Sequence, residues 1–148
     1  MRIEKIDHNN FDQVLPLICA YQRFYEVTDI DEARNREFFS QFVKSNERGV
    51  IHGVSMDDAM VGFSTIYFCY SSALAKSVAV LNDLFIIPEQ RAKGFGKALI
   101  ENAAAYAGSL GIERLQWLTA EKNTTAQGLY DSLAAKKSAW FFYAMETK

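Results

Sequence analysis

The chain has 148 residues, of which 49% are hydrophobic and 23% charged, a composition typical of a folded globular protein and not of a disordered or fibrous one. The net charge of −2 argues against general nucleic-acid binding, which needs a clustered basic surface. No apolar run approaches the roughly 18 to 20 residues of a membrane span, and no secretory signal opens the chain, so we expect one cytoplasmic domain over residues 1–148, with neither a nucleic-acid nor a membrane partner.

The N-terminal part of the chain predicts one strand and two helices. Residues 1–7 alternate loosely in hydrophobicity and predict a strand, after which Asn9 or Asn10 can cap a helix. Apolar residues then recur at three- and four-residue steps over 11–25 and again over 38–43. Each of these two helices is therefore expected to bury one face.

A change of period marks the middle of the chain as sheet. Residues 49–56 and 60–70 alternate and predict a β-hairpin. Residues 76–87 predict a further strand that ends at Pro88, because proline lacks the N–H that a central strand needs. The alanine-rich stretch from Gly94 to Leu110 predicts a helix with one apolar stripe.

The C-terminal part predicts a strand, a helix and a second strand. Residues 112–120 predict the first of these strands, Asn123 or Thr124 can cap a helix that runs to about Ala135, and the tail 136–147 is strand-like again. Because strands and helices alternate in this half, we expect an α/β domain with at least one parallel strand pair around the helix from Gly94.

The cysteines and tryptophans carry no visible site. Cys19 and Cys69 form no CxxC pair and have no histidine nearby, so we expect reduced core residues and no metal site. Trp117 and Trp140 are expected to pack in the core as well.

A glycine-rich junction, PEQRAKGFGKAL at residues 88–99, joins a predicted strand to a predicted helix. A phosphate-loop NTPase needs GxxxxGK followed by Ser or Thr, whereas Gly96-Lys97 is followed by Ala98 and no glycine stands five positions before Gly96. A dinucleotide fingerprint needs a third glycine, which is absent. Two interpretations remain: a tight turn with solvated basic residues, or an anion site in which backbone N–H groups and the helix dipole meet a phosphate.

The surroundings of this junction resemble the GCN5-related N-acetyltransferase (GNAT) family. The acyl-CoA signature of the family, R/Q-x-x-G-x-G/A, is matched by Arg91-Ala92-Lys93-Gly94-Phe95-Gly96, and its later N-x-x-A-x-x-L-Y by Asn123, Ala126, Leu129 and Tyr130. The resemblance covers residues 76–145, and the strand, helix, helix, hairpin order before them agrees with it. The chain departs from the family at Ala92, where glycine is common, and after the last helix, where Leu133-Ala134-Ala135 replaces Leu-Gly-Phe or Leu-Gly-Ala.

This resemblance implies a GNAT-type α/β fold: a mixed, mostly antiparallel twisted sheet of six to seven strands, with a parallel pair at the cofactor site and about four flanking helices. It also implies acetyl-CoA as the cofactor. Strand backbone would pair with the pantetheine arm and the loop would hold the pyrophosphate, which implicates Leu84, Phe85, Ile86, Arg91, Ala92, Lys93, Gly94, Phe95, Gly96, Lys97 and Asn123. For Asn123, a plain helix N-cap is an equal alternative.

Tyr130 and Asp83 are the catalytic candidates. The family commonly places a tyrosine at the position of Tyr130 as the general acid for the departing thiolate, and the alternative is a core aromatic residue. An alkylamine, with an ordinary pKa of about 10.4, must lose a proton before it attacks. Asp83 can receive that proton, directly or through water, and the alternative is a structural aspartate at a bulge.

The acceptor is expected between the first two helices. Aromatic and acidic side chains are frequent there and suit the binding of a cationic amine, although charge-rich loops are usually just solvated. The expected contacts to the amine are Tyr25, Glu26, Asp29 and Asn82. The pattern resembles diamine and polyamine acetyltransferases. The expected function is thus acetyl-CoA-dependent N-acetylation of a small primary amine by direct attack, and the alternative is a catalytically silent acyl-CoA-binding or regulatory domain. Family members often dimerise through their late strands, so the WFFY tail makes a homodimer an expectation unless it is core.

Overall fold

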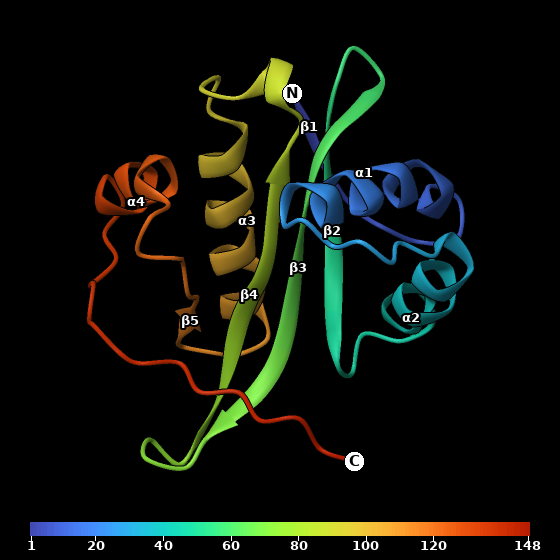
Figure 1. The fold of residues 1–148 in the computed structure, drawn as a ribbon. Coiled ribbons are helices and arrows are strands. Elements are labelled where there is room, and N and C mark those ends of the chain that lie inside the picture. The colour runs from blue at the N-terminus through green and yellow to red at the C-terminus, as the bar shows by residue number, and fades with distance from the viewer. The chain divides into compact units, whose positions relative to one another are not determined.

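The computed structural model describes residues 1–148. The unit Met1–Leu118 holds β1 (Arg2–Lys5), α1 (Phe11–Phe24), α2 (Glu32–Lys44), β2 (Gly49–Met56), β3 (Ala59–Ser71), β4 (Lys76–Ile86), the short 3₁₀ turn η1 (Pro88–Gln90), α3 (Phe95–Ser109) and β5 (Leu115–Gln116) (Figure 1). The unit Thr119–Lys148 holds α4 (Thr124–Asp131) and the tail after it. No helix combines the length and the apolar character needed to cross a membrane.

The strands of the first unit form one mixed sheet in the order β1-β2-β3-β4-β5. The pairings from β1 to β4 are antiparallel, whereas β4 and β5 run parallel, with Ala79 opposite Leu115 and Val80 opposite Gln116. A parallel pair needs a crossover connection, and α3 supplies it. The expected fold class and its parallel pair are confirmed, although the sheet has five strands where six to seven were expected.

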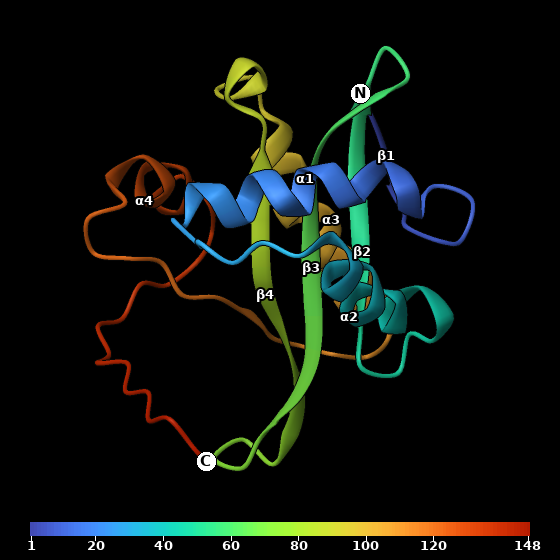
Figure 2. The same cartoon turned by 45° about the vertical axis from the view of Figure 1, so that its right-hand side comes forward.

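Helices cover both faces of this sheet, α1 and α2 on one side and α3 on the other (Figure 2). Apolar residues of α1 and α2 pack on one face against the β-strand residues Ile51, Phe63 and Phe85. Phe95 and Leu99 of α3 pack on the opposite face with Val54, Val61 and Ile86. Because successive strand residues alternate between faces, β4 contributes side chains to both layers.

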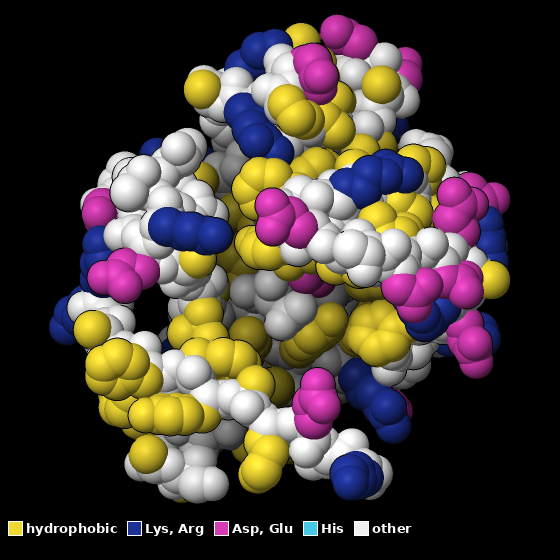
Figure 3. Space-filling view, viewed as in Figure 1, with side chains coloured by type: hydrophobic (Ala, Val, Ile, Leu, Met, Phe, Trp, Pro, Cys, Tyr) yellow, Lys and Arg dark blue, Asp and Glu magenta, His cyan; other side chains and the backbone are white.

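The tail after α4 was expected to be a strand, and this expectation is wrong. Residues 136–148 form no regular structure, and Trp140, expected in the core, is 81% exposed. A strand is stable only when it pairs with a neighbour, and the unit Thr119–Lys148 contains no other strand. Figure 3 shows the hydrophobic side chains of this tail gathered at the lower left.

Two smaller expectations are also corrected. The strand expected over residues 112–120 contains only Leu115–Gln116, and α4 ends at Asp131 instead of near Ala135. Cys19 is buried as expected, but Cys69 is exposed. Cys69 lies near the outer end of β3, next to the exposed Tyr70 and beyond the buried residues 61–66 of that strand.

Candidate active site

A bulge interrupts the pairing of β4 with β3 at the centre of the candidate site. Thr65 lies opposite Asp83, but the next residue of β3, Ile66, lies opposite Leu81. Asn82 therefore has no partner on β3. A bulge of this kind bends the strand and redirects its side chains. The result is that Asn82 is exposed whereas Asp83 is only 5% exposed.

Asp83 is a buried carboxylate at this bulge, with the hydroxyl groups of Tyr21 and Thr65 beside it. Its Oδ1 accepts a hydrogen bond from the Asn82 side-chain amide at 3.1 Å, while Oδ2 is buried and meets no hydrogen-bond donor of the protein. The opposite hydroxyl, that of Thr65, is also buried and unpaired. Burial raises the pKa of Asp83, and the polar groups of Tyr21, Thr65 and Asn82 oppose that rise. The bulge agrees with the structural alternative for Asp83, and its role as a proton acceptor stays a prediction.

Two tyrosines beside Asp83 were missed by the sequence analysis. Tyr21 comes from α1 and Tyr67 from β3. Burial is the main cause that raises the pKa of both phenols, that of Tyr67 to about 12, and the charge of Asp83 adds to it. Both hydroxyl groups therefore stay protonated at neutral pH and can donate hydrogen bonds. In the sequence Tyr21 is one more member of an amphipathic helix, so no local signal links it to Asp83.

The acidic segment after α1 is partly occupied by structural contacts. Asp29 forms an ion pair with Arg34 at 3.0 Å, and Asp31 caps α2 by accepting the Arg34 backbone N–H at 2.9 Å. Tyr25 differs, because its half-exposed ring lies 4.9 Å from the ring of Tyr21. Glu26 takes a positive φ of 58° at the turn that ends the helix. Of the residues expected to contact the amine in this segment, Tyr25 is thus the one that packs against Tyr21, the neighbour of Asp83.

The loop between η1 and α3 has a backbone suited to an anion. Ala92 and Gly94 have positive φ values of 59° and 87°, and a Cβ at Gly94 would meet no atom within 4 Å. Gly94 is the N-cap of α3, and no side chain caps this end of the helix. Unpaired N–H groups and the helix dipole therefore face outward together, the arrangement that binds phosphate groups.

Basic side chains surround this uncapped end. Lys93 Nζ donates to the carbonyl oxygen of Glu89 at 3.0 Å and to Oε1 of Gln90 at 2.9 Å. Lys97 lies 3.8 Å from Glu101, and Arg91 is hydrogen-bonded to the Ile86 carbonyl. All three basic residues are exposed and lie close to the start of α3 in the chain. The loop therefore fits the pyrophosphate of CoA.

The edge of β4 beyond the bulge fits an extended ligand. β5 pairs with β4 only at Ala79 and Val80, so residues 81–86 have no strand partner on the side away from β3. Leu84, Phe85 and Ile86 lie in this stretch, with Leu84 half-buried. An extended chain can add to such an edge through backbone hydrogen bonds, whatever the side chains are.

The two remaining predicted site residues lie in the unit Thr119–Lys148. Asn123 caps α4, since its side-chain oxygen accepts the Ala126 N–H at 3.3 Å, which confirms the structural alternative. Tyr130 lies in the last turn of α4 and is partly buried. Their roles toward a cofactor stay predictions.

Comparisons with known proteins agree with this arrangement. Residues 14–134 match the model of the acetyltransferase (GNAT) family. The uncharacterized N-acetyltransferase YhfO of Bacillus subtilis (strain 168) is 30% identical over 144 residues, covering 97% of this chain and 95% of the relative. The thialysine N-epsilon-acetyltransferase of Caenorhabditis elegans is 28% identical over 109 residues, covering 70% and 68%. A crystal structure of a probable acetyltransferase shares the fold, with a TM-score of 0.87 over 100% of this chain and 99% of that chain at 24% identity.

Proposed function

The chain belongs to the GNAT acetyltransferase family and is an N-acetyltransferase, and on this premise we propose that it transfers the acetyl group of acetyl-CoA to a primary amine of a small cationic molecule. The observation that carries the proposal is the buried carboxylate of Asp83 at the bulge of β4, with the phenol of Tyr21 beside it. The same strand leads directly to the loop that fits a pyrophosphate.

Asp83 prepares the acceptor in this proposal. An alkylammonium ion has its ordinary pKa near 10.4, so it must lose a proton before its nitrogen can attack. Asp83 takes that proton, directly or through a water molecule, and its raised pKa brings it nearer to the range of an effective base. Tyr21 and Tyr67 donate hydrogen bonds at neutral pH, and Tyr25 adds an aromatic face for the cation.

Acetyl-CoA supplies the acetyl group as a thioester when it is bound. The residues that would hold it are the β4 edge at Leu84, Phe85 and Ile86, the loop from Arg91 to Lys97, and Asn123. A backbone N–H of the β4 edge donates to the developing oxyanion. Tyr130 provides the proton for the departing sulfur, as the family motif implies.

A small cationic amine is the proposed acceptor. A relative named for thialysine acetylation supports a small amine acceptor, and the aromatic and acidic surroundings of Tyr25 favour a di- or polyamine. Asn82, Glu26 and Asp29 are further candidate contacts, with Asp29 already paired to Arg34. We also propose a cytoplasmic enzyme that acts as a homodimer.

The first test measures release of the CoA thiol from acetyl-CoA over a panel of diamines, polyamines, amino acids, aminoglycosides and peptides. We expect turnover on one class of cationic amines and a loss of about 100-fold or more in the Asp83→Asn variant, the range of general-base catalysis. Because burial disfavours the ionised carboxyl group, the same variant should melt at or above the temperature of the wild type. An Asp83→Asn variant that is fully active, or inactive only because it unfolds, would contradict the role of Asp83.

The Tyr130→Phe variant tests the general acid in the same assay. It keeps the ring and removes only the hydroxyl group, so kcat should fall while the KM for acetyl-CoA stays near the wild-type value. If the wild type binds acetyl-CoA without turnover on any amine, the silent acyl-CoA-binding alternative replaces the proposal. If the wild type binds no acetyl-CoA, the interpretation of the glycine loop is wrong.

A further inference from the structure

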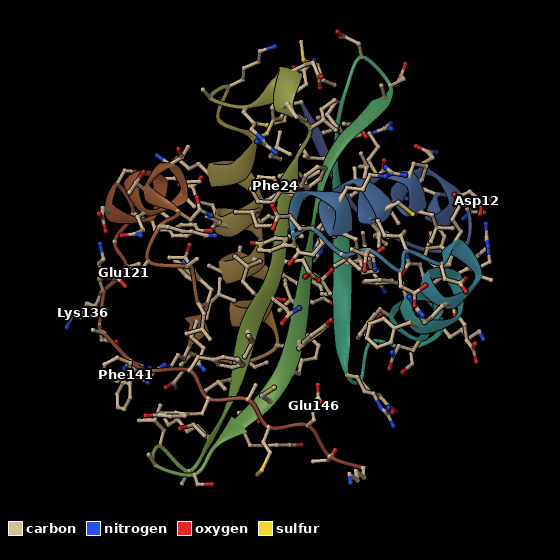
Figure 4. The ribbon with its side chains drawn as sticks, viewed as in Figure 1. Asp12, Phe24, Glu121, Lys136, Phe141 and Glu146 are labelled. Atoms are coloured by element: carbon tan, nitrogen blue, oxygen red, sulfur yellow. The ribbon has the colours of Figure 1, made fainter.

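Phe24 and Arg91 join the end of α1 to the candidate cofactor loop. The guanidinium carbon of Arg91 lies 5.2 Å from the centre of the Phe24 ring and 5.8 Å from the centre of the Phe85 ring. Its Nε donates a hydrogen bond to the carbonyl oxygen of Ile86 at 2.9 Å. The guanidinium is thus held by a ring from α1 and by a ring and a carbonyl group from β4. Figure 4 labels Phe24 at the end of α1 that reaches β4.

These contacts leave most of the hydrogen-bonding capacity of Arg91 for a ligand. A guanidinium has five N–H donors, and the hydrogen bond to Ile86 uses only the one on Nε. Arg91 forms no ion pair with a carboxylate, and it is exposed at the end of η1, before α3. The two terminal nitrogens form a planar fork that matches a pair of phosphate oxygens.

We propose that Phe24 is a positioning residue for acetyl-CoA, because its ring holds the Arg91 guanidinium in the orientation in which the terminal nitrogens meet the pyrophosphate. This inference rests on the proposed function, which makes acetyl-CoA the ligand of the loop. Arginine loses rotational freedom when it binds a phosphate, and a side chain that is already held in place loses less of it.

The position of Phe24 also relates the cofactor loop to the acceptor side. The Phe24 ring lies 5.2 Å from that of Tyr25, and Tyr25 lies 4.9 Å from Tyr21, the phenol beside Asp83. One helix end therefore carries both a contact to the cofactor arginine and the rings next to the candidate base.

The test is isothermal titration of CoA into the purified full chain and its Phe24→Leu variant. Leucine keeps apolar bulk at the end of α1 but has no aromatic face. A cation–π contact at an exposed site favours the held orientation of the guanidinium about two- to five-fold, so we expect CoA binding to weaken by up to that factor. Phe38→Leu is the matched control, because Phe38 is 48% exposed on α2 as Phe24 is 52% exposed on α1, yet its ring contacts Phe39 and Phe42. The control should bind CoA as the wild type does.

A double-mutant cycle with Arg91→Ala separates positioning from a general effect on stability. Once the guanidinium is gone, Phe24→Leu should weaken CoA binding no further. A Phe24→Leu variant that binds CoA as tightly as the wild type overturns the inference alone, as does an equal loss in both backgrounds. A wild-type chain that binds no CoA overturns the proposed function and this inference with it.

Discussion

His52 shows at the scale of one residue how burial sets the response of the protein to pH. It lies on β2, is 5% exposed, and its Nδ1 has no hydrogen-bond partner in the protein. The ring meets Tyr106 of α3 edge-on at 5.0 Å, and Lys5 is its partner on β1. Burial first, and the charge of Lys5 second, lower the pKa of His52 from 6.5 to about 4. The neutral imidazole is therefore the form that the fold accepts.

We expect His52 to make the folded state less stable in mild acid. The unfolded chain binds a proton near pH 6.5 and the folded chain only near pH 4, so stability is fully present above pH 6.5 and falls as the pH drops between these values. The difference, at roughly 1.4 kcal/mol per pKa unit, amounts to about 3 kcal/mol of unfolding free energy. Urea denaturation at pH 7.5 and pH 4.5 measures it. The His52→Gln variant, which does not titrate, should lose less than the wild type over this interval, and parallel losses would contradict the assignment.

Single residues also show which parts of the site could be inferred from sequence. Asp83 could be identified from the sequence because a carboxylate inside an apolar strand is conspicuous. A bulge at this position was part of the structural alternative, and the structure contains it. Tyr21 and Tyr67 could not be identified as site residues from the sequence. Their proximity to Asp83 arises from the crossing of α1 over the sheet and from the register of β3, and neither follows from spacing along the chain.

At the scale of elements, the close contact of β3 with β4 positions the candidate cofactor edge. Gly62 faces Ile86 in the register of the two strands. A Cβ at Gly62 would stand 2.5 Å from the carbonyl oxygen of Phe85 and 2.4 Å from Cδ1 of Ile86, so there is no room for a side chain. The backbones of the two strands must approach closely for β4 to lie where it does.

We therefore expect Gly62→Ala to push β4 away from β3 and to lower the unfolding free energy by about 1 to 3 kcal/mol, the range of overpacking changes. CoA binding should weaken as well, because the displaced residues belong to the candidate pantetheine edge. Gly108→Ala is the matched control, since a Cβ there meets nothing within 4 Å in helix α3. Thermal melting of both variants measures the change in stability, and CoA titration measures the change in affinity. A Gly62→Ala protein as stable as the control would mean that β4 moves without cost.

Elements were predicted well where periodicity and packing agree. The helices α1 and α3 and the β2–β3 hairpin follow the expected residues within a few positions. The strand predicted for the tail is absent because the strand propensity of WFFY does not indicate a neighbouring strand to pair with. A strand forms only where such a neighbour is present. The expectation for Cys69 was wrong because cysteine is usually buried, whereas this one lies on β3 beyond the buried residues 61–66.

At the scale of the whole molecule, the fold class was predicted because local signals and topology rules lead to the same answer. Hairpin turns place β2, β3 and β4 side by side, and the crossover through α3 requires a parallel partner for β4. The local sequence signals do not determine the environment of the aromatic tail. Trp140, Phe141, Phe142, Tyr143 and Met145 are all at least 80% exposed in a single chain. Exposed apolar surface of this size usually marks an interface.

We expect this tail to be buried between two copies of the chain. Light scattering after size-exclusion chromatography should give the mass of a dimer, and the fluorescence of Trp140 should shift to shorter wavelength as the protein concentration rises through the dissociation constant. The double variant Phe141→Glu, Phe142→Glu places two carboxylates in the interface, whose burial without partners is costly, so this variant should be monomeric. A Phe24→Leu protein serves as the control, since it removes an exposed aromatic ring from α1 and should remain dimeric. A wild type that stays monomeric at high concentration would contradict the dimer itself. A dimeric double variant would place the interface elsewhere and leave the aromatic tail to be explained by packing within its own chain.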